Sequence, residues 1–217
     1  MNLTVAIAQA TPVVLDLAAS VAKACDWIAE AGKRGAQLLA FPETWLPVYP
    51  FWCDAGTFGT WGHEPSKRLH ARLARNSLVI PSKETEQLCR AARDARCAVA
   101  LGANERDLSG SLYNSLLFIS AEGEILGKHR KLVPTFGERL VWGYGDAAGL
   151  RAHDIAGARV GGLICGSTGC RLRATSCTPT ASRCTSPRGR IAAKCINSAR
   201  ATTPSRAEPS SSSPQRT

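Results

Sequence analysis

Three side chains that could act together in catalysis each follow a predicted strand: Glu43, Lys131 and Cys165. A thiol becomes a nucleophile when a base takes its proton. A carboxylate can be that base if burial beside a cation tunes its proton affinity. A lysine can stabilise the negative charge that develops on a substrate nitrogen or oxygen in a tetrahedral intermediate. Because a sheet positions the loops at its strand ends rigidly, the three residues predict nucleophilic catalysis by a cysteine.

Each of these residues also has a plainer interpretation. Glu43 could be a solvated loop acid, Cys165 a buried thiol, and Lys131 one of several neighbouring cations. A Cys–His pair with His129 as the base is a further alternative. The 4 histidines share no ligand spacing, so we expect no metal site.

The elements that must position these residues alternate along the chain. Short apolar runs predict strands, at residues 3–10, 37–41, 97–102, 113–120, 125–131 and 160–164. The first of them is expected to be buried, and the runs at 113–120 and 125–131 flank a polar turn that predicts an antiparallel hairpin. Asp16 and Ser82 are the expected N-caps of two helices, which end near Gly32 and Arg96.

This order of elements predicts an α+β or layered α/β domain, with a mixed β-sheet and helices on one side. Residues 1–165 suffice for one hydrophobic core, but the partner layer that would close it is missing. Asn104 and Asn114 flank a strand and are expected to serve turns or the sheet edge. Residues 45–62 are rich in aromatic residues, Pro and Gly, and form a loop long enough to indicate a function.

The character of the sequence changes after Cys165. Residues 166–217 contain no Phe, Trp, Tyr, Val or Met, and too few large aliphatics to bury a core. If one base is inserted after the Cys165 codon and GC-rich codons are chosen for the downstream residues, the translation becomes C-W-E-H-W-M-P-L-A-R. We therefore interpret residues 1–165 as the amino-terminal part of an enzyme domain, and residues 166–217 as a disordered, out-of-frame tail. A natural disordered tail is the alternative.

The charge divides at the same point. Nine of the 27 Lys and Arg residues follow Cys165, against the single acid Glu208, whereas residues 1–165 are nearly balanced. A basic-tailed nucleic-acid binding protein is the non-enzyme alternative, which we disfavour because the tail has no aromatic residues for base stacking. The tail cysteines form no C-x-x-C pair. With no signal peptide and no membrane-spanning run, we expect a cytoplasmic protein with reduced thiols and no membrane contact.

The segments around the three residues resemble the nitrilase superfamily of carbon-nitrogen hydrolases, whose Glu-Lys-Cys triad has this chain order. Residues 35–50 (G-A-Q-L-L-A-F-P-E-T-W-L-P-V-Y-P) look like the first signature of the family, with Val48 where Gly is usual. Residues 127–146 are similar to the block that holds the lysine and a second glutamate. The residues G-G-L-I-C at 161–165 begin the third signature, which the restored frame would continue.

The resemblance implies an α-β-β-α sandwich, here incomplete, and a role for each residue. Glu43 would take the proton of Cys165, the thiolate would add to the substrate carbon, and Lys131 would stabilise the nitrogen of the thioimidate. Glu138 would help to position substrate or water; its structural alternative is a salt bridge to Arg139 or Lys131.

Details around the triad favour nitrilases, which convert organic nitriles to carboxylic acids and ammonia, over amidases and other members of the superfamily. The implied partner is a small-molecule nitrile, and no specific nucleic acid. The resemblance also implies that no metal or organic cofactor is required. Full-length members often form homo-oligomers. Because the segment after the nucleophile is replaced, we expect this truncated chain to be inactive.

Overall fold

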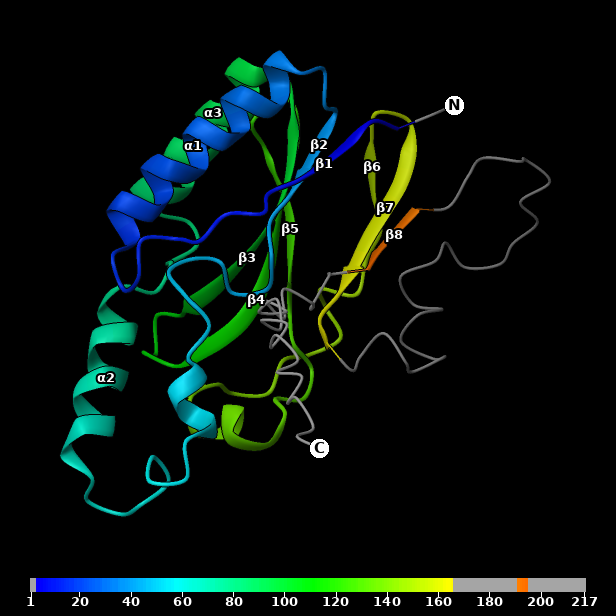
Figure 1. Cartoon of the computed structure of the whole chain (residues 1–217). Helices are drawn as coiled ribbons and strands as arrows, with labels where there is room; N and C mark the ends of the chain where they lie inside the picture. The colour runs from blue at the N-terminus through cyan, green and yellow to red at the C-terminus, as the bar shows by residue number, and fades with distance from the viewer. Residues whose placement is uncertain (1–2, 166–190, 195–217) are drawn as a thin grey trace, which may run out of the picture.

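The computed structural model describes residues 3–165 and 191–194. The helices are α1 (Leu17–Lys33), α2 (Glu64–Arg75) and α3 (Lys83–Ala95), with short 3-10 helices η1 (Phe51–Asp54) and η2 (Phe136–Leu140). The strands are β1 (Val5–Ile7), β2 (Leu38–Ala40), β3 (Ala98–Arg106), β4 (Leu112–Ile119), β5 (Ile125–Arg130), β6 (His153–Ile155), β7 (Ala158–Leu163) and β8 (Ile191–Lys194). Figure 1 shows α1 and α3 on one side of a large sheet and β6, β7 and β8 on the other.

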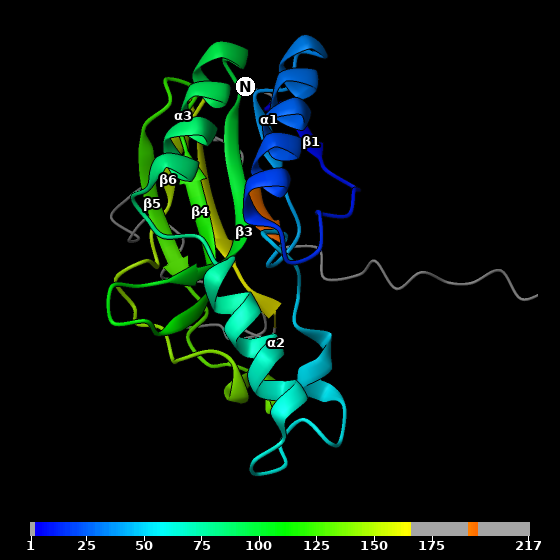
Figure 2. The same ribbon diagram turned by 90° about the vertical axis from the view of Figure 1, so that its left-hand side faces the viewer.

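Helices α1 and α3 begin at the two predicted caps. The carboxylate of Asp16 accepts a hydrogen bond from the backbone N–H of Ala19 (3.0 Å), and Ser82 forms a capping box with Thr85. The helices lie side by side over the sheet (Figure 2). They cross closely because Gly32 has no side chain: a Cβ there would lie 2.5 Å from the carbonyl oxygen of Ala95.

The larger sheet has the order β1-β2-β3-β4-β5. Strands β1, β2 and β3 are parallel, and β3, β4 and β5 pair antiparallel, which confirms the predicted hairpin and the mixed sheet. Side chains alternate between its two faces. Residues such as Leu39, Val99 and Leu117 pack beneath α1 and α3, and residues such as Leu116 and Phe118 pack on the opposite face. Helices α1 and α3 therefore cover only one face of the large sheet.

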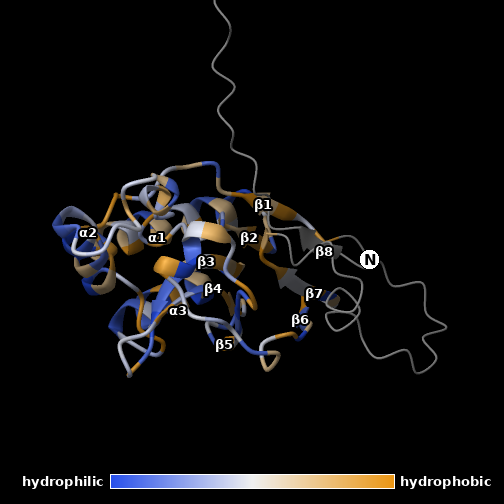
Figure 3. Cartoon of the chain, turned by 90° about the horizontal axis from the view of Figure 1, so that it is seen from below, coloured by the Kyte–Doolittle hydropathy of each residue, from blue (hydrophilic) through white to orange (hydrophobic). Residues whose placement is uncertain are grey.

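The opposite face packs against a second sheet with the order β6-β7-β8. Val160 of β7 and Ile155 of β6 share a buried cluster with Leu116 and Phe118. Seen from below, the helices, the large sheet and the second sheet form successive layers (Figure 3). The layered fold class is confirmed, but the placement of residues 160–164 in the same sheet as the other strands was wrong. Periodicity marks a strand and does not identify its neighbours.

Three further expectations differ from the structure. The first strand is short and lies at the sheet edge, with Val5 39% and Ile7 51% exposed, so the prediction that it is buried was wrong. Helix α2 was not predicted because its sequence is mostly polar and only Leu73 is buried. Asn104 and Asn114 lie inside β3 and β4 and are buried, not at turns. Within the described ranges, no helix is long and apolar enough to cross a membrane.

Candidate functional site

The three predicted residues lie just beyond the carboxyl ends of three strands. Glu43 follows β2, Lys131 follows β5 directly, and Cys165 follows β7. Strands β2, β5 and β7 run in the same direction in Figure 1, so these ends meet at one end of the layered body. The two sheets thus bring together residues that are far apart in the sequence.

Glu43 lies on a loop that runs tightly against β3. The backbone N–H groups of Phe41 and Leu46 donate to carbonyls of β3, at Ala100 (2.8 Å) and Gly102 (3.1 Å). A Cβ on Gly102 would lie 2.1 Å from the carbonyl oxygen of Pro42 and 2.8 Å from the Cα of Glu43. Glycine at position 102 is therefore needed for the loop to take this path.

The carboxylate of Glu43 is buried, and one of its oxygens accepts two hydrogen bonds. Oε1 accepts from the side-chain amide of Asn114 (2.6 Å) and from the ammonium of Lys131 (3.4 Å). Oε2 is buried and has no hydrogen-bond partner among the described residues. Burial raises the pKa of Glu43, and the contacts with Lys131 and Asn114 only partly oppose it. A raised pKa suits a carboxyl group that must take up a proton.

Lys131 is 2% exposed and lies between two carboxylates. Its Nζ is 2.6 Å and 2.9 Å from the two oxygens of Glu138, and 3.4 Å from Oε1 of Glu43. Burial by itself would lower the pKa of Lys131, but the charges of Glu43, Glu138 and Cys165 outweigh burial and raise it. The ammonium is therefore kept charged in a site where a bare cation would be costly.

Glu138 accepts hydrogen bonds from protein donors on both oxygens. Besides Lys131, the hydroxyl of Tyr49 donates to Oε1 (2.8 Å), and the backbone N–H of Thr135 donates to Oε2 (2.6 Å) as part of a capping box of η2. The structural alternative, a salt bridge to Lys131, is present, whereas Arg139 donates to the carbonyl of Pro134 instead. A role of Glu138 in positioning substrate stays a prediction.

Cys165 is partly buried beside the cluster between the two sheets. Its contribution to the raised pKa of Lys131 indicates that the two side chains interact electrostatically. The backbone of Cys165 has a φ of 53°, in the left-handed region that residues with a Cβ rarely occupy. Such conformations are costly and often occur at active sites. The expected segment after the nucleophile lies outside the described residues.

Glu43 and Glu138 differ in how many hydrogen bonds they accept, and the charges around Lys131 explain why this matters. One buried ammonium cannot compensate two ionised carboxylates and a thiolate at once. Glu138 accepts four hydrogen bonds from protein donors, at least one on each oxygen. Oε2 of Glu43 has no hydrogen-bond partner among the described residues. Glu43 is therefore the carboxyl group that can take up a proton without losing a hydrogen bond.

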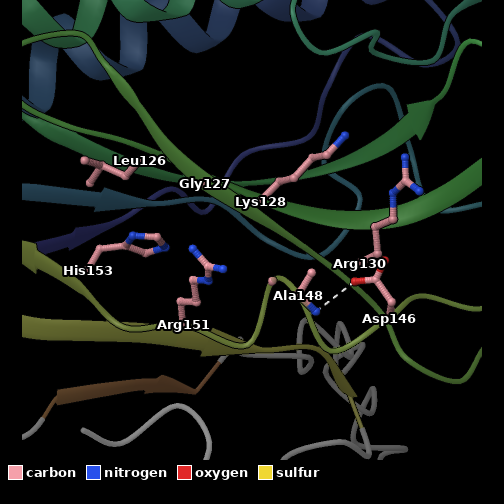
Figure 4. Close-up of a pocket in the computed structure, with 9 residues that line it drawn as sticks. Leu126, Gly127, Lys128, Arg130, Asp146, Ala148, Arg151 and His153 are labelled. Carbon is pink, nitrogen blue, oxygen red and sulfur yellow. Dashed lines mark hydrogen bonds between the residues drawn. The ribbon is translucent and has the colours of Figure 1, made fainter.

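A separate cavity of about 400 Å³ lies along β5, and it contains none of the three residues. Lys128 and Arg130 line it, but Figure 4 shows their head groups pointing away from Arg151 and His153. Both cations bind the buried carboxylate of Glu105. These ion pairs connect β3, which carries Glu105, to β5. Strand β5 ends directly before Lys131.

No group of three or more His, Cys, Asp or Glu side chains in the described part of the chain could hold a metal ion. His129 is fully buried within β5. Cys53 is also buried, in η1, and burial and the neighbouring Asp54 raise the pKa of its thiol to about 11. Cys53 is therefore poorly suited to be a nucleophile.

Comparison with known proteins identifies the class of the molecule. The chain matches the carbon-nitrogen hydrolase family over residues 4–178, and it belongs to that family.

The chain is also similar in sequence to proteins named nitrilases. It is 48% identical over 166 residues to a protein named Nitrilase 2 from an unknown prokaryotic organism, and this match covers 76% of the chain and 51% of that protein. It is 40% identical over 163 residues to an aliphatic nitrilase of Rhodococcus rhodochrous, covering 74% of the chain and 43% of the relative. The chain thus spans about half the length of the curated relatives it matches.

Solved structures share the fold at low sequence identity. Nit3 of Saccharomyces cerevisiae, a member of branch 10 of the nitrilase superfamily, matches with a TM-score of 0.62 at 19% identity, over 79% of this chain and 58% of that one. An amidase from Nesterenkonia sp. AN1 matches with a TM-score of 0.57 at 18% identity, over 81% and 62%. These likenesses confirm the nitrilase-like layered fold.

Two residues of the site were not predicted as such. Asn114 contacts Glu43, and Tyr49 contacts Glu138. A signal existed for Asn114, because it is an amide in the predicted strand at residues 113–120, which is otherwise largely apolar. A buried polar side chain in such a strand requires a partner.

Proposed function

We propose that residues 1–165 carry the catalytic residues of a nitrilase, which hydrolyses organic nitriles to carboxylic acids and ammonia. The observation that carries the proposal is the buried contact of Lys131 with Glu43 and Glu138, beside Cys165 at the shared end of three strands. The identities of 40–48% to nitrilases support the nitrile as the substrate class.

In the proposed first step, Oε2 of Glu43 takes the proton of Cys165. Oε1 is already held by Asn114 and Lys131, which leaves Oε2 as the available oxygen. The thiolate sulfur adds to the nitrile carbon, and the proton moves to the nitrile nitrogen, which gives a thioimidate. Lys131 stabilises the negative charge that develops on this nitrogen.

In the proposed later steps, water adds to the thioimidate carbon and ammonia leaves, so that a thioester remains on Cys165. A second water hydrolyses the thioester to the carboxylic acid and restores the thiol. Glu43 accepts and returns a proton in each addition. These steps use only side chains and water.

We also propose that residues 166–217 are an out-of-frame tail, and that the functional protein continues in another frame. The length of the relatives supports this, since the chain covers 51% and 47% of the first two. Re-sequencing the coding DNA across the Cys165 codon tests the proposal. A missing base would support it, and an intact frame in independent reads would contradict it.

The test of the activity is ammonia release by the frame-restored protein, given nitriles and the corresponding amides. We expect no turnover in Cys165→Ala, and a loss of about 100-fold or more in Glu43→Gln and Lys131→Ala, the size of effect typical for a general base or an electrostatic donor.

Two variants serve as controls. Lys128→Ala removes a cation that binds Glu105 outside the site and should stay within a few-fold of the parent. His129→Gln tests the Cys–His alternative, which predicts a loss as large as that of Glu43→Gln. Amide turnover far above nitrile turnover would make the protein an amidase instead.

A further inference from the structure

Two buried asparagines lie opposite each other on neighbouring strands. Asn104 of β3 and Asn114 of β4 are register partners, and both are at most 1% exposed. The amide of Asn104 donates to the backbone carbonyls of Leu46 and Val48 and holds a loop. The amide of Asn114 instead donates to the carboxylate of Glu43 (2.6 Å). The two residues are neighbours across the β3–β4 pair, but their side chains have different partners.

Asn114 also contacts the second member of the site through its backbone. Its carbonyl oxygen accepts a hydrogen bond from the backbone N–H of Lys131 (2.7 Å), which continues the pairing of β4 with β5. One residue of β4 thus fixes the side chain of Glu43 and the backbone of Lys131. A shift of β4 would move both groups.

Asn114 makes the shorter of the two hydrogen bonds that Glu43 accepts. The ammonium of Lys131 is 3.4 Å from Glu43 but 2.6 Å from Glu138, so it favours the other carboxylate. An amide has no charge to gain or lose in this range of pH, so Asn114 can orient Glu43 without competing for its proton.

We propose that Asn114 is a positioning residue for the general base: it holds Oε1 of Glu43 so that Oε2 remains free to take the proton of Cys165. This inference rests on the proposed function, because it assigns Glu43 as the base. The side-chain oxygen of Asn114 is itself buried without a partner among the described residues.

The proposal predicts a change in the pH at which Cys165 becomes reactive. The amide of Asn114 stabilises the ionised form of Glu43 and lowers its pKa, against the larger effect of burial. Loss of this hydrogen bond therefore raises the pKa of Glu43. The base then ionises only at higher pH, and activation of the thiol moves to higher pH with it.

The experiment measures alkylation of Cys165 by iodoacetamide against pH, in the full 217-residue chain, with peptide mass spectrometry to read this cysteine alone. The thiolate displaces iodide, so no nitrile turnover is needed. In Asn114→Ser we expect the pH at which alkylation of Cys165 is half-maximal, the midpoint, to rise by about one unit. This is the effect of losing one hydrogen bond to an ionised group.

Asn104→Ser is the matched control, since it removes the partner amide from the same sheet. It should lower the melting temperature and leave the midpoint in place. If Asn114→Ser does not fold, Asn114→Asp keeps the size of the side chain and should also raise the midpoint. A midpoint that stays in place in the folded Asn114 variants, or that moves equally in Asn104→Ser, would overturn the proposal. This result is independent of whether nitriles are the substrate.

Discussion

Glu43 and Glu138 lie on either side of one lysine, yet only Glu43 keeps an oxygen without a protein donor among the described residues. Both oxygens of Glu138 accept hydrogen bonds, from a lysine, a tyrosine and a backbone N–H. We therefore assign the anchoring of Lys131 to Glu138, whose two oxygens it contacts, and proton transfer to Glu43. The same atoms explain why Lys131 can remain an ammonium while it is 2% exposed.

This division of roles predicts the pH dependence of Glu138→Gln. The charge of Glu138 is one of the causes that raise the pKa of Glu43, after burial. Its removal should lower that pKa, so the acid limb of kcat/KM should move to lower pH, while kcat falls because Lys131 is less well held. The measurement is a pH profile of ammonia release.

The control for this profile is Glu105→Gln, which removes a buried acid that binds Lys128 and Arg130. It should destabilise the fold by about 2 kcal/mol without moving the acid limb. An acid limb that moves upward in Glu138→Gln would contradict the assignment, since it would mean that Glu138 is not a source of negative charge near Glu43.

At the scale of elements, the site depends on how closely the Glu43 loop follows β3. Gly102→Ala places a Cβ 2.1 Å from the carbonyl oxygen of Pro42. We expect a loss of about 1–3 kcal/mol in stability from overpacking, together with a displaced Glu43 and slower alkylation of Cys165. Thermal unfolding and alkylation of Cys165 measure the two effects.

Gly56→Ala is the matched control, because a Cβ there meets nothing within 4 Å. It should leave both the melting temperature and the reactivity of Cys165 unchanged. If Gly102→Ala were as stable and as reactive as the parent chain, the loop would not need its close path along β3.

The strand ends could be predicted from the sequence, but their partners could not. Apolar runs located β2, β5 and β7, and therefore the positions of Glu43, Lys131 and Cys165. The second sheet was missed because β6 is only three residues long and because periodicity does not say which strands pair. The contact between Asn114 and Glu43 joins residues 71 positions apart, and no local pattern encodes it.

The whole molecule is two packed sheets with one helical layer, over the described residues. The chain belongs to the carbon-nitrogen hydrolases but covers about half of its relatives' length. The exposed Val5 and Ile7 lie at the edge of the large sheet. An exposed apolar strand at the edge of a sheet favours association with other chains. Turnover of a nitrile should be tested in the frame-restored protein, whereas alkylation of Cys165 is measured in the 217-residue chain.

The most direct test of the site is mass spectrometry of the frame-restored protein, quenched within the first turnover of a nitrile. We predict an adduct on the peptide that contains Cys165, first with the mass of the whole nitrile and then with that of the acyl group. The adduct should be absent in Cys165→Ala and should form more slowly in Glu43→Gln. Ammonia released with no adduct on Cys165, or with the adduct on another residue such as Cys53, would contradict the proposed site.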